Sequence, residues 1–316
     1  MSIFDTVAVT PSLKPAEPGA YGRAPKDFRL PADLRLGPVR LQVADLERSV
    51  DFYRQVLGMT LLAEQPGRAV LGGPDLELVE LRELPGARPA PARGRLGLYH
   101  FAILLPDRPS LGRFVRHLAD LGVRAGSADH HVSEAIYLQD PDGLGIEVYA
   151  DRPRSRWQRR GRELHIGTEA LDVSGLVRSA GSEPWPGVPA GTVMGHLHLH
   201  VGDLEDASAF YSEALGFDRI AETIPGALFV GAGGYHHHLG TNTWSGRGAT
   251  PAADDEARLL EWTIELPGSD DLEAVAASLE RHGYSFERAS DGGSAGGLLT
   301  RDPWGTALRL QARATA

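Results

Sequence analysis

The stretch VGDLEDASAFYSEALGF, residues 201–217, is a second copy of an earlier one, VADLERSVDFYRQVLGM, residues 43–59. Eight of the seventeen positions are identical. Each copy has the pattern of a strand end, an aspartate that can cap a helix, a helix with a Phe-Tyr pair, and a Leu-Gly stop. Short segments of alternating hydrophobicity follow each copy and indicate about three strands. The repeat therefore predicts a βαβββ unit in each half of the chain.

Each half also contains a more diverged copy of the same unit. GLYHFAILLPDRPSLGRFVRHLADLGV, residues 97–123, parallels RLLEWTIELPGSDDLEAVAASLERHGY, residues 258–284. Both continue to a DPxG turn, whose Asp, Pro and Gly are structural turn residues. We therefore expect four βαβββ modules, at about 36–83, 96–150, 192–243 and 257–312.

Two segments do not fit the repeat. Residues 1–35 are rich in Pro, Ala and Gly without periodicity and are expected to form an N-terminal arm. Residues 151–190 change from basic to Pro/Gly-rich, which is typical of a connector. These bounds predict one two-module domain at 36–150 and a second at 191–314.

Composition excludes several classes of function. The 316 residues include no cysteine, so disulfides, zinc–thiolate sites and thiol nucleophiles are excluded, and a transition-metal site must use His, Asp or Glu. The net charge of −10 argues against a nucleic-acid partner. Neither a membrane-spanning apolar run nor a secretory signal pattern is recognised, so we expect no membrane partner and a cytoplasmic location.

One short segment raises the question of a site. In VMGHLHLHVGDL, residues 193–204, His196, His198 and His200 alternate with leucines, so in a strand they share one face. Such a face is either solvated or lines a site, and isolated strand histidines are more often packed or exposed than ligands.

Together, the motifs VxDLxxSxxFYxxxLG and DPDGxxxE at these spacings resemble the vicinal oxygen chelate superfamily over residues 36–312. Within it, LYHFAILLPD, HHVSEAIYLQDPDGLGIEVYADRPR, GHLHLHV and GGYHHHLGTNTW are similar to the bacterial catechol 2,3-dioxygenases, which are extradiol ring-cleaving enzymes. The resemblance implies an α+β fold, in which the four βαβββ modules form two cupped mixed-sheet barrels.

The resemblance also implies a metal site with a first-strand His from one module and a first-strand His and last-strand Glu from its partner. The first-strand positions are, in module order, Pro38, His100, His196 and Glu261. The last-strand position is Glu147 in the second module and Arg309 in the fourth. Only modules 96–150 and 192–243 together supply the set His100, Glu147 and His196, so we expect the active cup to form from them, although the family more often pairs its modules otherwise.

Two histidines and one carboxylate form the facial triad of non-haem iron(II) oxygenases. Fe(II) is therefore the expected cofactor. Mn(II) fits the same ligands, and Zn(II) tolerates them. The alternative is that the histidines are packed or solvent-facing and the glutamate is a surface charge.

The same resemblance implies further roles. Tyr137, ten residues before Glu147, matches a tyrosine that hydrogen-bonds a substrate oxygen. We expect a strand through GYHHHLGTNTW, in which alternation puts His236 and His238 on one face and His237 on the other. His237 matches the acid–base histidine that the family places on this strand, although a one-residue shift would exchange the faces.

His130 is a loose match to the family's substrate-binding histidine; His131 or Glu134 could serve instead, or the segment could be only a loop. Apart from the resemblance, His198 shares the strand face of His196 and is expected to line the cavity near the metal, and His200, further along, to be a polar residue toward the rim. Arg152, Arg154 and Trp157 follow Glu147 closely and either cover the cavity or belong to a solvated connector.

These patterns lead to one hypothesis and two alternatives. We expect an extradiol dioxygenase that opens a small aromatic diol with O2. A glyoxalase-like, metal-dependent isomerase or lyase is the second hypothesis, but it would use Glu where this chain has His237. A metal-free protein that binds a small aromatic ligand is the third. The ring substituents and a homo-oligomeric state are left open.

Overall fold

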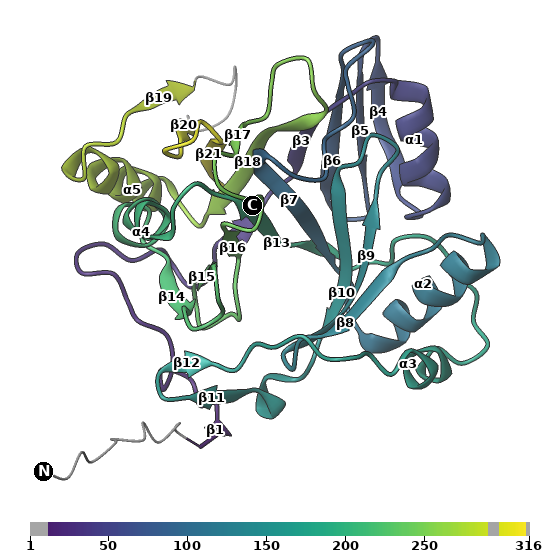
Figure 1. Ribbon diagram of the computed structural model, residues 1–316, viewed down its shortest axis with the longest axis horizontal. Helices are drawn as coiled ribbons and strands as arrows, with labels where there is room; N and C mark the ends of the chain where they lie inside the picture. Colours follow the sequence, from purple (N-terminus) through teal and green to yellow (C-terminus); the bar gives the residue numbers. More distant parts are fainter. Residues whose placement is uncertain (1–11, 290–296, 314–316) are drawn as a thin grey trace, which may run out of the picture.

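The computed structural model describes residues 12–289 and 297–313. It is a mixed α+β protein built around strongly bent sheets, which confirms the predicted fold class (Figure 1). Within the described ranges, no helix combines the length and the apolar character that crossing a membrane requires.

Four units share the order strand, helix and three strands. The first consists of β3 (Val39–Val43), α1 (Leu46–Gln55), β4 (Thr60–Gln65), β5 (Arg68–Gly72) and β6 (Glu77–Glu83). The second consists of β7 (Arg95–Leu104), α2 (Arg108–Asp120), β8 (Gly126–Asp129), β9 (Ser133–Gln139) and β10 (Gly145–Asp151). The third consists of β13 (Val193–His200), α4 (Leu204–Ala207) with its π-helical continuation η2 (Ser208–Ala214), β14 (Asp218–Ala221), β15 (Ala227–Gly231) and β16 (Leu239–Asn242). The fourth consists of β18 (Arg258–Leu266), α5 (Ser269–Arg281), β19 (Phe286–Ala289), β20 (Gly297–Arg301) and β21 (Ala307–Ala312).

The units combine in a crossed manner. One curved sheet has the order β8-β9-β10-β7-β13-β16-β15-β14, so it joins the second and third units. The other has the order β4-β5-β6-β3-β18-β21-β20-β19, so it joins the first and fourth. In each sheet the two first strands are antiparallel neighbours, and each lies parallel to the last strand of its own unit. We call the first sheet the inner cup and the second the outer cup.

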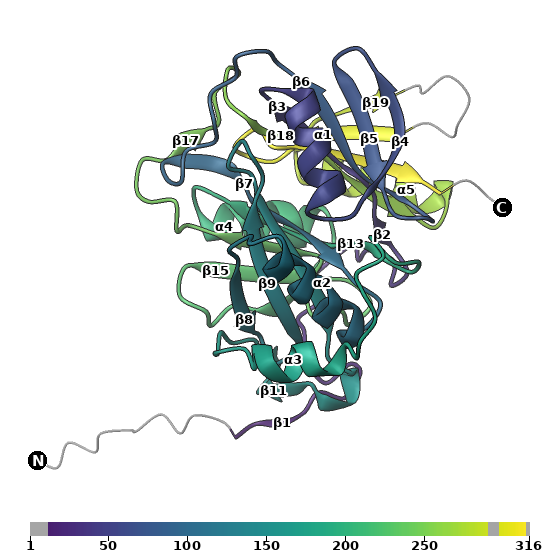
Figure 2. The same cartoon turned by 90° about the vertical axis from the view of Figure 1, so that its right-hand side faces the viewer.

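Short elements tie the cups together. Strand β2 (Arg35–Leu36) contacts both central ladders, since Leu36 lies opposite Met194 in β13 and opposite Ile264 in β18. Figures 1 and 2 show helices α1, α2 and α5 on the outside of the sheets. The remaining short elements are β1 (Lys14–Pro15), η1 (Arg154–Arg156), β11 (Gln158–Arg160), β12 (Glu163–Leu164), α3 (Val173–Ser179) and β17 (Thr250–Pro251).

The segments predicted as arm and connector pack against each other. Lys14 lies opposite Arg159 and Pro15 opposite Gln158, so β1 extends the small β11–β12 sheet. Residues 1–11 of the arm lie outside the described residues.

The local signals read from the repeat have physical counterparts. The side chain of Asp45 accepts a hydrogen bond from the backbone N–H of Arg48, and Asp203 accepts from the N–H groups of Glu205 and Asp206. Both aspartates therefore cap their helices, as predicted. Gly58, after the first helix, has φ +75°, a conformation that favours glycine.

The helix with the Phe-Tyr pair is hydrogen-bonded to a DPxG turn, once in each half of the chain. The hydroxyl of Tyr53 donates to Asp140 at 3.3 Å, and that of Tyr211 donates to Asp302 at 2.8 Å. Both aspartates begin DPxG turns and also accept backbone N–H groups inside the turn. Because each pair joins a helix of one cup to a turn of the other, these buried bonds hold the two cups together.

We predict that Tyr211→Phe destabilises the protein by about 1–3 kcal/mol, because it leaves a buried carboxylate oxygen of Asp302 without a donor. Urea denaturation followed by circular dichroism measures the loss. Tyr53→Phe is the matched control, and its longer hydrogen bond predicts a smaller loss. Equal losses in the two variants would contradict this ranking.

Candidate metal centre

Strand pairing brings residues from distant parts of the chain to one point. On β7, Ala102 lies opposite Glu147 of β10 on one side and opposite His196 of β13 on the other. His100, two residues earlier on β7, lies opposite His198. The three predicted ligands therefore surround one small side chain at the centre of the inner cup.

Two irregularities of register aim the side chains. A shift between Met194 and His196 centres on Gly195, where a Cβ would collide with the hydroxyl of Tyr149. A second shift, opposite Tyr99, lets Tyr99 and His100 both contact the ring of His198, with centroids 5.2 and 5.1 Å away. β-Bulges commonly re-aim a side chain next to a site, and both shifts do so here.

The three candidate ligands are buried and converge. The Nε2 atoms of His100 and His196 lie 3.0 and 3.2 Å from Oε2 of Glu147. The potential ligand atoms all lie within 4.8 Å of one another, and each residue is at most 5% exposed.

Protonation favours metal binding by this group. Burial lowers the pKa of His100, which keeps its imidazole neutral. Burial alone would raise the pKa of Glu147, but His196 and His100 outweigh it and hold that pKa well below its usual range. Among the described residues, Nε2 of His100 has no well-aligned hydrogen-bond partner although it is buried. An ionised carboxylate beside two converging imidazole nitrogens is a donor set that suits a divalent cation, so the residues fit a metal ion.

Tyr137 and His130 lie together beside this group. The hydroxyl of Tyr137 is 2.6 Å from Nε2 of His130, and Tyr137 lies opposite Glu147 in the ladder of β9 and β10. Nδ1 of His130 is 2.6 Å from the carbonyl of Gly167, which can only accept, so Nδ1 carries the proton and Nε2 accepts from the tyrosine. Burial raises the pKa of Tyr137 well above its usual value, and the charge of Glu147 adds to this, so the phenol stays protonated.

The two alternatives to His130 lie elsewhere. The ring of His131 stacks on His165, with centroids 4.6 Å apart. Glu134 is buried in an ion pair with Arg108 at 2.6 Å, and Arg152 lies 3.3 Å from it. Of these three residues, only His130 hydrogen-bonds Tyr137.

The assumption that a strand runs through the three consecutive histidines is wrong. They lie in the loop before β16, because the chain turns at Gly233 and Gly234, which both have positive φ. His237 lies against His196, with ring centroids 4.2 Å apart. Burial lowers the pKa of His237 well below its usual value, and the neighbouring histidines add to this, so its ring is neutral.

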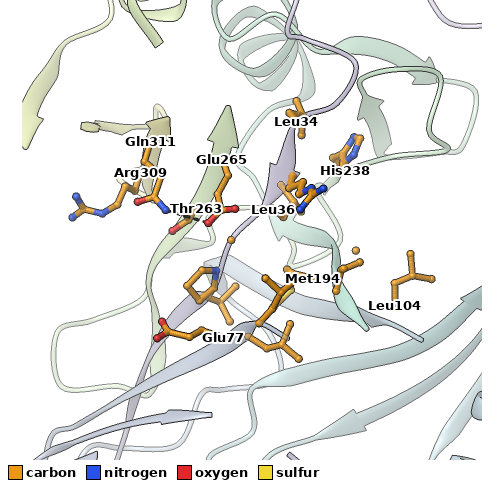
Figure 3. Close-up of a pocket in the computed structure, with 18 of the residues that line it drawn as sticks. Leu34, Leu36, Glu77, Leu104, Met194, His238, Thr263, Glu265, Arg309 and Gln311 are labelled. Atoms are coloured by element: carbon orange, nitrogen blue, oxygen red, sulfur yellow. Dashed lines mark hydrogen bonds between the residues drawn. The ribbon is translucent and has the colours of Figure 1, made fainter. Parts of the chain in front are cut away.

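His238 faces away from the candidate ligands. It lines a cavity of about 900 Å³ between the cups, whose walls carry apolar side chains such as Leu34 and Met194 and polar ones such as Thr263 and Gln311 (Figure 3). Its Nδ1 accepts from the backbone N–H of Ala232, and burial lowers its pKa to about 3. The candidate metal ligands do not line this cavity.

His198 and His200 follow on the same strand face. His198 is buried, its ring contacts His100, and burial holds its pKa well below the usual range. The rings of Tyr99 and Trp244 also contact that of His198, with centroids 5.2 and 5.5 Å away, and both side chains are substantially exposed. His200 is half-buried and bonds Asn242 at 2.7 Å, which suits the polar rim residue expected from the sequence.

Several residues at the site were missed by sequence reasoning. Asp151 lies 2.9 Å from Nε2 of His236, and the hydroxyls of Tyr149 and Tyr235 lie 2.7 Å apart. Asp151 ends the strand that carries Glu147, but its position alone does not distinguish it from any other strand-end aspartate. The predicted cover residue Trp157 is buried, and its indole N–H donates to the carbonyl of Arg152. Arg154 lies over its ring.

The outer cup has a different arrangement at the matching point. Arg40 lies opposite both Glu80 and Glu261, as Ala102 lies opposite Glu147 and His196. Its guanidinium lies 2.9 Å from Glu80 and 3.1 Å from Glu261. Burial alone would raise the pKa of Glu80, but three arginines, Arg68, Arg40 and Arg82, lower it to about 2. The guanidinium of Arg40 thus supplies, between two carboxylates of the outer cup, the positive charge that a metal ion would supply at the matching point of the inner cup.

Comparison with known proteins agrees with this architecture. The family model described as Glyoxalase/Bleomycin resistance protein/Dioxygenase superfamily matches residues 35–148 and 193–310. The chain belongs to this superfamily. It is 45% identical over 262 residues to a catechol-2,3-dioxygenase of Bacillus subtilis (strain 168), a match that covers 82% of this chain and 92% of the relative.

More distant relatives extend the likeness. A lactoylglutathione lyase of Escherichia coli O157:H7 is 31% identical over 133 residues, which cover 39% of this chain and 97% of that protein. The crystal structure of glyoxalase I from Zea mays superposes with a TM-score of 0.54 at 20% identity, covering 88% of this chain and 92% of that one. This second likeness shows the fold alone.

We predict that the protein binds one divalent metal ion per chain. Glu147→Gln is expected to weaken metal affinity by more than about 100-fold, since partners of ligands alone are worth 10–100-fold. Elemental analysis and competition with a chromophoric chelator measure stoichiometry and affinity. His200→Gln, on the same strand face as His196, is the matched control and should bind metal normally. Unchanged affinity in Glu147→Gln would exclude this site.

Proposed function

We propose that the protein is an extradiol ring-cleaving dioxygenase, which opens a catechol-type aromatic diol with O2 at a non-haem centre of two histidines and one glutamate. The observation that carries the proposal is the buried convergence of His100, His196 and Glu147. The likeness to a catechol-2,3-dioxygenase over most of both chains supports the substrate class.

The metal cofactor is proposed to be Fe(II), with Mn(II) as the alternative. A triad of two imidazoles and one carboxylate is typical of non-haem Fe(II) oxygenases. Such an ion, held by His100, His196 and Glu147, would bring the diol and O2 together and allow electron transfer between them. The site also needs little water nearby, and the near-complete burial of the three ligands provides that.

His237 is proposed to move protons. Its neutral ring lies against His196, so a diol bound at the triad would have an unprotonated imidazole nitrogen near one hydroxyl. Nε2 of His237 can take that proton and return it as the ring opens. Histidine at this point also supports an oxygenase over a glyoxalase-type lyase, which would use a carboxylate as its base.

Tyr137 and His130 are proposed to bind the substrate oxygens. Because the hydroxyl proton of Tyr137 points to His130, its oxygen lone pairs can accept a hydrogen bond from a substrate hydroxyl. His198 is proposed to line the same space. The cytoplasmic location, the absence of nucleic-acid and membrane partners, and a homo-oligomer stay predictions.

The activity has a direct test. We expect protein loaded anaerobically with Fe(II), mixed with catechol and then exposed to air, to consume O2 and form a yellow ring-opened product. An oxygen electrode and a visible spectrum record both. Protein of the lyase or metal-free binding class would consume no O2. Absence of O2 uptake across a panel of catechols and hydroquinones would refute the proposal.

Tyr137→Phe tests the substrate contact. We expect kcat/KM for catechol to fall by about 10–100-fold, equivalent to a lost hydrogen bond of 1.5–3 kcal/mol, with metal affinity unchanged. Tyr284→Phe, a half-buried tyrosine of the outer cup, is the control and should keep full activity. A Tyr137→Phe enzyme with parental kinetics would exclude the role of this hydroxyl.

A further inference from the structure

A chain of hydrogen-bonding groups leads from the protein surface to His237. Oδ1 of Asp151 lies 2.9 Å from Nε2 of His236. Nδ1 of His236 lies 2.8 Å from Nδ1 of His237. The ring of His237 in turn contacts the candidate ligand His196. The side chain of Asp151 is 27% exposed, whereas that of His236 is completely buried.

The direction of each bond follows from the chemistry of its ends. A carboxylate only accepts, so Nε2 of His236 carries a proton. The His236 ring is packed among Tyr235, Trp157 and Tyr149. In the neutral ring, a proton on Nε2 leaves the lone pair on Nδ1. Two Nδ1 atoms 2.8 Å apart need one proton between them, and it must therefore belong to His237.

We infer that Asp151 and His236 are positioning residues that fix the tautomer of His237, with the proton on Nδ1 and the lone pair on Nε2. The inference deepens the proposed function, on which it rests, because the lone pair at Nε2 is the one that would accept a proton from the diol. If the hydrogen bond between His236 and His237 ran in the opposite direction, Nε2 of His237 would carry the proton and could not accept one from the diol.

Neighbouring residues hold this chain of hydrogen bonds in place. The hydroxyl of Tyr235 reaches the same Oδ1 of Asp151 at 3.4 Å and meets the hydroxyl of Tyr149 at 2.7 Å. Tyr149 itself fits only because Gly195 has no side chain, and its ring lies 4.8 Å from that of His196. The tautomer of His237 and the position of a candidate ligand therefore depend on one packed group.

The decisive variant is Asp151→Leu. Oδ1 of Asp151 is the acceptor for Nε2 of His236, and a leucine side chain offers neither an acceptor nor a donor in its place. Without that acceptor the proton of His236 is no longer held on Nε2, so it can move to Nδ1, and His237 can then accept at Nδ1 and carry its own proton on Nε2. Leucine is close to aspartate in shape, so the ring positions should persist.

Long-range ¹H–¹⁵N correlation spectra of the full chain, labelled with ¹⁵N-histidine and loaded with diamagnetic Zn(II), report both tautomers directly. His237→Gln identifies the resonances. We expect the Nδ1–H tautomer of His237 in the parent protein and a substantial population of the Nε2–H tautomer in Asp151→Leu. The control is Asp255→Leu, at an exposed aspartate paired with Arg88, and it should leave the spectrum unchanged.

Two spectral results would overturn the inference: a proton on Nε2 of His237 in the parent protein, or an Nδ1–H tautomer that survives undiminished in Asp151→Leu. We also expect kcat of Asp151→Leu to fall by about 10–100-fold, with KM and metal affinity unchanged. A loss of metal affinity in place of a tautomer change would show a merely structural role. If the parent protein cleaves no catechol, the proposed function fails, whereas the spectra still decide the tautomer.

Discussion

The antiparallel ladder between β7 and β13 is the interaction on which the site depends, because it joins strands that lie on opposite sides of a long connector. Leu197 lies opposite Phe101 in this ladder, and both are buried in the main core. A slip of one residue would turn His196 toward that core and Leu197 toward the cup. The hydrophobic pattern that stabilises the ladder therefore also sets which side chains converge.

The crossed combination of units gives the tyrosine of the Phe-Tyr pair and the aspartate of the DPxG turn the same structural role in both halves of the chain. The Phe-Tyr helix and the DPxG turn are far apart in sequence and belong to different cups, yet Tyr53 bonds Asp140 and Tyr211 bonds Asp302. These contacts join consecutive units, whereas the central ladders join β7 to β13 and β3 to β18. Each unit is thus held by two neighbours, which limits independent movement of the cups.

Much of the fold could be read from the sequence, because its signals are local. Strand alternation, the capping residues Asp45 and Asp203 and the DPxG turns act within a few residues of themselves. The candidate ligands could be named because they fall on motif positions of a known family, although their roles stay predictions. The bulge that turns Tyr99 into the cup could not be predicted from the sequence, because the register shift between β7 and β13 depends on both strands.

The loop with three consecutive histidines shows a second limit. Alternation assigns faces only within a strand, and here two glycines with positive φ end that regularity before His236. The contact of Asp151 with His236 depends on two segments 85 residues apart, so no local pattern contains it. Tertiary proximity, which decides hydrogen bonding between side chains, was the information that the sequence lacked.

The guanidinium of Arg40 has a consequence for the molecule under metal starvation. In the outer cup the positive charge between Glu80 and Glu261 is part of the polypeptide and cannot be extracted by a chelator. In the inner cup the corresponding positive charge would be a metal ion, which exchanges with the surroundings. Removal of that ion would disturb the electrostatics of the inner cup, whereas the ion pairs of Arg40 in the outer cup would stay in place.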